Sequence, residues 1–180
     1  MRLCRAIRAF LATACFSLLS LANASEPSWN RITLPVKIGS VPTHLWLRCF
    51  FQVPDRLVNS AGDERDLWRS STVFAISNIP GQFEIFLNGQ SIINSTGVPF
   101  GKEQRFKVPK GVLEKTKFNN LVIRIGSEVD GEMMSSSPVL LDYFHELTLG
   151  SEWESTTTKP TAIELQPRAE KPPFAAYPAS

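Results

Sequence analysis

The sequence predicts an all-β protein of the jelly-roll β-sandwich class, and three observations lead to this prediction. First, apolar and polar residues alternate with a period of two in many short runs. Second, Asn88-Gly89 separates two such runs, at residues 83–87 and 90–93, which is the strongest short-range signal of a β-hairpin. Third, clusters of Gly, Pro, Asn and Ser separate the runs. No convincing helix longer than a turn or two lies between them, which favours two packed sheets or a barrel.

The alternating runs predict strands at residues 32–38, 45–53, 72–76, 83–87, 90–93, 105–108, 121–125, 139–141 and 144–149. Residues 109–115 predict one helical turn, because Pro109 suits a first-turn position and Gly111 limits extension. In the second strand, alternate residues including Leu47, Cys49 and Phe51 form the expected core face. Cys49 is therefore expected to be a buried, inert thiol.

Residues 1–24 are predicted to be a secretory signal peptide. Three arginines are followed by an apolar run at residues 9–22 and by Ala22-Asn23-Ala24, with cleavage expected after Ala24. The apolar run is shorter than the ~20 residues that a bilayer core requires, so a membrane anchor is disfavoured. We therefore expect a secreted or periplasmic protein without a transmembrane segment in the mature chain. A lipoprotein anchored at Cys15 is the alternative.

The remaining chain predicts one domain and a tail. Residues 25–154 have the usual size of a single domain. From residue 155 the sequence becomes rich in Pro and Thr, which predicts a disordered tail or a linker to a further domain over residues 155–180. The 180-residue chain has a formal net charge of +2, which becomes −1 (2 minus 3) when the three arginines of the signal peptide leave. No basic stripe remains, so a nucleic-acid partner is not expected.

A candidate ligand-binding patch lies on the strand faces that point away from the core. Alternation places Trp46 and Arg48 on such a face, and Glu84 and Arg124 on similar faces of two other strands. An aromatic ring can stack on the C–H groups of a sugar, while polar side chains reach its hydroxyls. Trp68, after a charged loop, is a further candidate. The alternative is that these residues only cover the core and form cross-strand ion pairs.

Catalytic and metal-binding motifs are not apparent in the sequence. His44 and His145 lie far apart, no Gly-x-Ser-x-Gly motif is present, and no His or Cys cluster has zinc spacing. No catalytic residue and no cofactor are therefore assigned. Asp130-Gly131-Glu132 could supply oxygen ligands to a structural calcium ion. Met133 and Met134, in the same polar loop, would make flexible apolar contacts at a rim if they were exposed.

Several short motifs together resemble the galactose-binding-like jelly-roll domain. These are Trp46-Leu47-Arg48, the strand ending in Leu87-Asn88-Gly89-Gln90, Phe106-Lys107-Val108-Pro109, Asn119, Ile123-Arg124-Ile125, and the closing run from Leu147 to Trp153. This domain is the sugar-binding module of family 2 glycoside hydrolases and an insert in sialate O-acetylesterases. The chain departs from the family pattern at Lys117, in place of a turn glycine, and at Leu47, in place of a tyrosine.

The resemblance implies a non-catalytic, carbohydrate-binding-like accessory module, because the catalytic residues of those enzymes belong to other domains, and the predicted signal peptide makes it an exported one. Its partner would be a carbohydrate or a catalytic protein, and the chain could be the leading part of a glycan-processing enzyme. A structural or protein-interaction β-sandwich without a sugar ligand is the second interpretation. A hydrolase that acts on glycans is the third.

Overall fold

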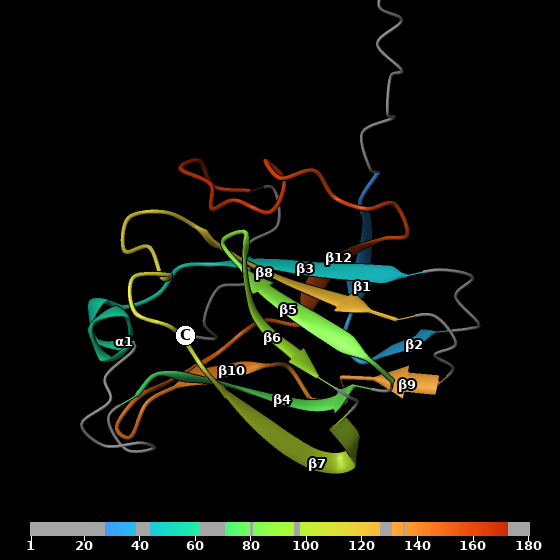
Figure 1. Ribbon diagram of the computed structural model, residues 1–180, viewed down its shortest axis with the longest axis horizontal. Helices are drawn as coiled ribbons and strands as arrows, with labels where there is room; N and C mark the ends of the chain where they lie inside the picture. Colours follow the sequence, from blue (N-terminus) through green and yellow to red (C-terminus); the bar gives the residue numbers. More distant parts are fainter. Residues whose placement is uncertain are drawn as a thin grey trace, which may run out of the picture.

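The computed structural model describes residues 28–38, 44–61, 71–79, 81–95, 98–126, 131–134 and 136–172. Most of the described elements are strands, in two main antiparallel sheets (Figure 1). The larger sheet has the order β1 (Asn30–Thr33), β12 (Glu152–Thr156), β3 (Leu45–Phe51), β8 (Asn119–Ile125), β5 (Phe83–Leu87), β6 (Gln90–Ser95). The smaller has the order β11 (Glu146–Thr148), β10 (Val139–Leu141), β4 (Val73–Ile79), β7 (Val98–Lys107), and β2 (Val36–Ile38) pairs separately with β9 (Gly131–Met133). The predicted all-β class is confirmed.

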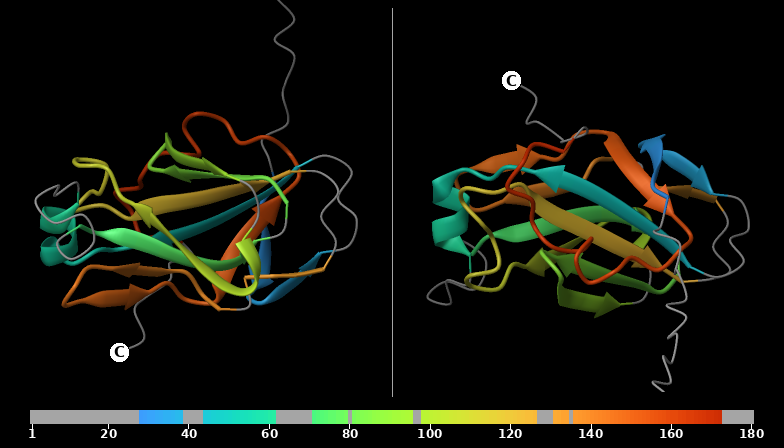
Figure 2. Two further views of the ribbon diagram at one scale, coloured as in Figure 1. Left: turned by 60° about the horizontal axis from the view of Figure 1, so that its bottom comes forward. Right: turned by 90° about the horizontal axis from the view of Figure 1, so that it is seen from above.

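The hydrophobic core fills the space between the two main sheets, which form two layers in the left view of Figure 2. Phe51 of β3 meets Phe74 of β4 edge-on, with 6.0 Å between ring centroids. Phe83 of β5 meets Phe106 of β7 in the same way at 5.8 Å. Each pair joins one sheet to the other, so the burial of apolar area holds the layers together. Cys49 is buried, as predicted.

The predicted hairpin is present between β5 and β6. Asn88 and Gly89 both have positive φ, at 51° and 83°, as a two-residue turn with the right twist requires. The Asn88 side chain also accepts a hydrogen bond from the Asn120 backbone N–H at 2.8 Å, which fixes the turn against β8. The turn residues identified from sequence therefore have a second role in the packing of the sheet.

Several predicted boundaries were wrong. The single strand expected at 32–38 is divided at Leu34-Pro35 into β1 and β2, which pair with different partners. Proline lacks the N–H group that a continuous ladder needs, which explains the interruption. The strand expected at 105–108 begins much earlier, at Val98. Strands β9 and β12 were not predicted. Residues 109–115, expected to form a helical turn, form no helix. The helix that the structure describes is α1 (Asp55–Ser60), directly after Pro54.

The tail predicted from Ser155 onward is corrected for residues 155–172. Ser155 and Thr156 complete β12, and residues 157–172, here called the strap, cross the outer face of the six-stranded sheet (Figure 2, right). Phe118 and Arg168 exchange two backbone hydrogen bonds, of 2.8 and 2.9 Å. Composition predicted disorder because the strap has few apolar residues, but its backbone groups bond to the sheet. Residues 173–180 lie outside the described residues.

Two further expectations concern burial and membranes. Met133 and Met134 are fully buried in the core, so they are not rim contacts. Within the described part of the chain, no helix is long and apolar enough to cross a bilayer. The predicted signal peptide, residues 1–24, lies outside the described residues.

Candidate functional site

The structure brings four of the five predicted ligand-binding residues together on the outer face of the six-stranded sheet. The strand register places Arg124 of β8 between Trp46 of β3 and Glu84 of β5. Arg48 lies two residues along β3 on the same face. Trp68 falls outside the described residues. Period-two alternation was thus sufficient to group residues from three strands.

Trp46 is covered by its neighbours. Its ring lies 5.8 Å from the Phe86 ring, and the Arg124 guanidinium lies 5.9 Å from its centroid. Only 5% of Trp46 is exposed. Arg124 in turn forms an ion pair of 3.0 Å with Glu84, and both side chains are partly exposed. The accessible part of the predicted patch is therefore the Arg124–Glu84 pair rather than an indole ring.

Arg48 is also buried and already has partners. Its Nε donates to Glu154 Oε2 at 2.6 Å, and its guanidinium lies 3.9 Å from the Trp29 ring centroid. Burial lowers the pKa of Arg48, and the hydrogen bond and charge of Glu154 only partly offset this effect. Arg48 Nη1 has no hydrogen-bond partner. In this arrangement Arg48 holds other protein groups and does not face solvent.

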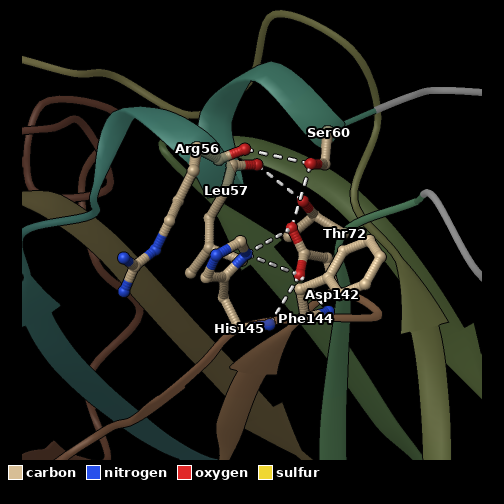
Figure 3. Close-up of polar contacts among 7 residues, drawn as sticks. All are labelled: Arg56, Leu57, Ser60, Thr72, Asp142, Phe144 and His145. Carbon is tan, nitrogen blue, oxygen red and sulfur yellow. Dashed lines mark hydrogen bonds and ion pairs between the residues drawn. The ribbon is translucent and has the colours of Figure 1, made fainter.

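A second group of polar and aromatic residues lies at the turn between β10 and β11 (Figure 3). Asp142 Oδ1 accepts hydrogen bonds from the backbone N–H groups of Phe144 and His145, each of 2.8 Å. The His145 ring lies 3.1 Å from the same oxygen, and Ser60 of α1 donates to Oδ2 at 3.0 Å. One carboxylate therefore fixes the shape of the turn and ties it to α1.

Hydrogen bonding determines the protonation of Asp142. Burial would raise the pKa of this carboxyl group, but hydrogen bonds from Phe144, Ser60 and His145 outweigh it and lower the pKa below its usual value. Asp142 is therefore ionised at neutral pH and is a stable anchor for the turn.

The fixed turn presents two aromatic rings to solvent. Tyr143 is 59% exposed and Phe144 is 79% exposed. Their ring centroids are 4.6 Å apart and the rings are nearly perpendicular, at 89°. Residues 141–146 line an open hollow of about 290 Å³ beside the rings. Large exposed rings on a turn with a fixed backbone are typical of recognition sites, because the turn itself loses little conformational entropy on binding.

Ser60, Asp142 and His145 do not have the geometry of a nucleophilic triad. In such a triad the imidazole lies between the hydroxyl and the acid, and accepts the hydroxyl proton. Here Asp142 lies between the other two, and Ser60 Oγ is bonded to Asp142 and to the Arg56 carbonyl, at 2.9 Å. No described hydrogen bond joins Ser60 to His145. The cluster supports a turn rather than an activated serine.

The described residues contain no cluster of three or more His, Cys, Asp or Glu that could hold a metal ion. In the calcium candidate at 130–132, Asp130 and the side chain of Glu132 lie outside the described part of the chain.

The aromatic turn was missed at the level of sequence, where residues 144–149 were expected to form a strand. The strand begins at Glu146 instead. Two signals point to the turn: Asp142 can accept from backbone groups two and three residues later, and adjacent Tyr143 and Phe144 cannot both face the core in a strand.

Comparison with models of known protein families gives no match, and comparison with curated protein sequences gives none either.

Proposed function

We propose that this protein is an exported, non-catalytic recognition module of the galactose-binding-like jelly-roll type, and that it binds a carbohydrate at the turn between β10 and β11. The observation that carries this proposal is the exposed Tyr143–Phe144 pair, on a turn whose backbone is hydrogen-bonded to Asp142. The two-sheet architecture and the motif resemblance agree with such a module. The Trp46 and Arg48 positions, predicted to bind the sugar, are less suitable because both are buried.

The chemistry of the turn suits a sugar. An exposed ring face can stack on the apolar C–H side of a pyranose. The half-exposed His145 ring and the exposed Glu146 side chain supply hydrogen-bonding groups beside the aromatic pair. The hollow of about 290 Å³ is near the lower end of the usual range for ligand pockets, about 300–1,000 Å³.

The geometry also limits the size of the ligand. A long flat polysaccharide needs several coplanar rings, whereas Tyr143 and Phe144 are nearly perpendicular. We therefore infer that the ligand is a single sugar unit or the end of a chain.

A protein-interaction module is the second candidate function. The specific observation in its favour is the exposure of Phe144, because a protruding aromatic side chain fits a pocket on a protein partner as well as a sugar. In this case the ligand would be a protein surface, and binding would show no dependence on glycans.

The test is binding of the purified protein to an array of mono- and oligosaccharides, with Phe144→Ala as the site variant. Ile163→Ala is the matched control, since Ile163 is a large exposed apolar residue on the strap, 84% exposed. We expect Phe144→Ala to weaken binding by about tenfold or more, in line with the ~1–3 kcal/mol that aromatic stacking contributes to ligand binding. Ile163→Ala should bind like the wild type.

Two results would contradict the proposal. Absence of binding to every glycan would favour the protein-interaction module. Hydrolysis of aryl glycosides or aryl acetates by the pure protein, at rates that follow the protein concentration, would show that the module is catalytic.

A further inference from the structure

The strap contacts the outer face of the six-stranded sheet mainly through backbone groups. Asn120 Nδ2 donates to the Glu164 carbonyl at 2.7 Å, and Arg168 pairs with Phe118 through backbone groups alone. The Arg168 guanidinium lies over the Phe50 ring, 4.9 Å from its centroid. Proteins also bind peptides by main-chain bonds with a few side-chain anchors. The strap is not extended throughout, since residues 162–165 form a turn in which the Gln166 N–H donates to the Ile163 carbonyl at 3.1 Å.

Beneath the strap, the sheet offers a prepared aromatic and polar surface. Phe50 and Asn120 are directly opposite each other on β3 and β8, and both are essentially fully buried. Trp29 extends this surface, and its indole donates to the Glu164 side chain at 2.8 Å. The sheet fixes the positions of Phe50 and Asn120, so the surface would need little rearrangement to bind a chain of similar conformation.

Two polar atoms of this face remain unsatisfied with the strap in place. Arg48 and Asn120 are each about 95% buried or more, and their atoms Arg48 Nη1 and Asn120 Oδ1 have no hydrogen-bond partner. Nearly all buried polar groups in native proteins have a partner. The strap therefore covers this face without giving these two polar atoms a hydrogen-bond partner.

The strap buries few large apolar side chains of its own. Of its two large apolar residues, Ile163 is 84% exposed and Leu165 is partly exposed, and the strap's buried apolar residues are Pro160 and Pro172. The connecting residues Thr157, Thr158 and Lys159 are all exposed. A segment with few buried apolar contacts opens at a lower free energy than the core does. The exposed connector leaves room for the strap to leave the sheet while β12 stays paired.

We propose that the outer face of the six-stranded sheet is a recognition site for a segment with the sequence and turn conformation of the strap. The chain's own strap fills it here, and the strap of a second copy of this chain can replace it. In a monomer the chain's own strap is favoured over the strap of another copy. Its short connector, residues 157–159, holds it near the face at a high effective concentration, which is in the mM range for short flexible linkers. The site is separate from the aromatic turn and does not depend on the carbohydrate proposal.

The experiment uses the full chain with a specific protease site inserted between Thr158 and Lys159. The folded protein is cleaved, and a fluorescent synthetic peptide of residues 160–172 is added. We expect the cleaved protein to release its own fragment and bind the labelled peptide. The uncleaved protein should bind it at least tenfold more weakly, because its own strap competes.

Peptide variants test the contacts. A peptide with Glu164→Ala, which loses the bond to Trp29, should bind the cleaved protein about tenfold more weakly. A peptide with Ile163→Ala is the matched control and should bind as well as the original, because Ile163 faces solvent.

Three outcomes would overturn the proposal. The fragment could remain bound without exchange for days after cleavage, or the cleaved protein could lose its β-sheet circular dichroism signal; either result would make the strap a structural part of the fold. Displacement of the labelled peptide by oligosaccharides but not by unlabelled peptide would assign the face to a sugar.

Discussion

The indole Nε1 of Trp29 donates a hydrogen bond of 2.8 Å to the carboxylate of Glu164, which lies 135 residues later in the chain. The other oxygen of Glu164 accepts from the backbone N–H and the hydroxyl of Thr161, each at 2.9 Å. One side chain thus holds the strap in shape and ties it to the residue that precedes β1. The behaviour of the strap should therefore depend on the charge of this carboxylate.

The first prediction concerns the pH dependence of strap docking. Burial by itself would raise the pKa of Glu164. Hydrogen bonds from Thr161 and Trp29 and the charge of Arg48 have a larger, opposite effect, so the pKa lies below its usual value. The carboxyl group of Glu164 has a lower pKa when the strap is docked than when it is not. Its ionised form therefore stabilises docking at pH values above the undocked pKa, about 4.3. This stabilisation is lost as the pH falls through the docked pKa. Strap amides should therefore exchange hydrogen faster as pH falls from 6 to 3, after correction for intrinsic exchange.

Glu164→Gln is the matched control for this effect, because glutamine has a similar shape and does not titrate. The variant should show a flatter pH dependence of strap exchange in mass spectrometry. A slope equal to that of the wild type would show that another group controls docking.

The second prediction compares two glycines with positive φ. Gly89 (φ 83°) lies under the Gln166 side chain, which an added Cβ would contact, whereas Gly111 (φ 77°) has no atom within 4 Å of such a Cβ. Alanine at either position should cost about 1 kcal/mol in the free energy of unfolding, from backbone strain alone. Only Gly89→Ala should also speed hydrogen exchange in the strap. Equal exchange in the two variants would mean that Gln166 moves aside without effect.

Local patterns in the sequence were sufficient for the sheet and its faces. Alternation gave the inward set on β3 and grouped Trp46, Arg48, Glu84 and Arg124 on one face, and Asn88-Gly89 gave the hairpin. These features depend on neighbours along the chain or directly across a ladder. The ligand roles of these residues and of Trp68 remain predictions.

The features that were missed depend on contacts distant in sequence. Strand β12 is polar in sequence except for Trp153, which is buried in the core, and the segment pairs as a strand between β1 and β3. The strap has the composition of a disordered tail, but Phe118 and Asn120 bond to its backbone and Trp29 bonds to its Glu164 side chain. Composition describes what a segment can bury by itself, and it does not describe what another part of the chain offers to it.

The third prediction concerns the aromatic turn. Asp142→Ala removes the acceptor for the backbone N–H groups of Phe144 and His145 and for Ser60, so we expect a loss of about 1–3 kcal/mol in stability. Ser60→Ala removes one of these bonds and should cost about 1 kcal/mol. Chemical denaturation measures both. If Asp142→Ala weakens glycan binding and Ser60→Ala preserves it, the shape of the turn matters for recognition. If Asp142→Ala is as stable as the wild type, Asp142 does not anchor the turn.

The last prediction compares two ion pairs on one sheet face. Arg48 and Glu154 are nearly buried, whereas Arg124 and Glu84 are partly exposed. Arg48→Met leaves Glu154 without its buried partner and should cost about 3–5 kcal/mol, whereas Arg124→Met should cost about 0–1 kcal/mol because solvent screens that pair. The double variant Arg48→Met, Glu154→Leu should be more stable than Arg48→Met alone, since no unpaired charge remains. Urea unfolding of all three variants measures this order, and equal costs for the two single variants would show that burial does not decide the strength of the pairs.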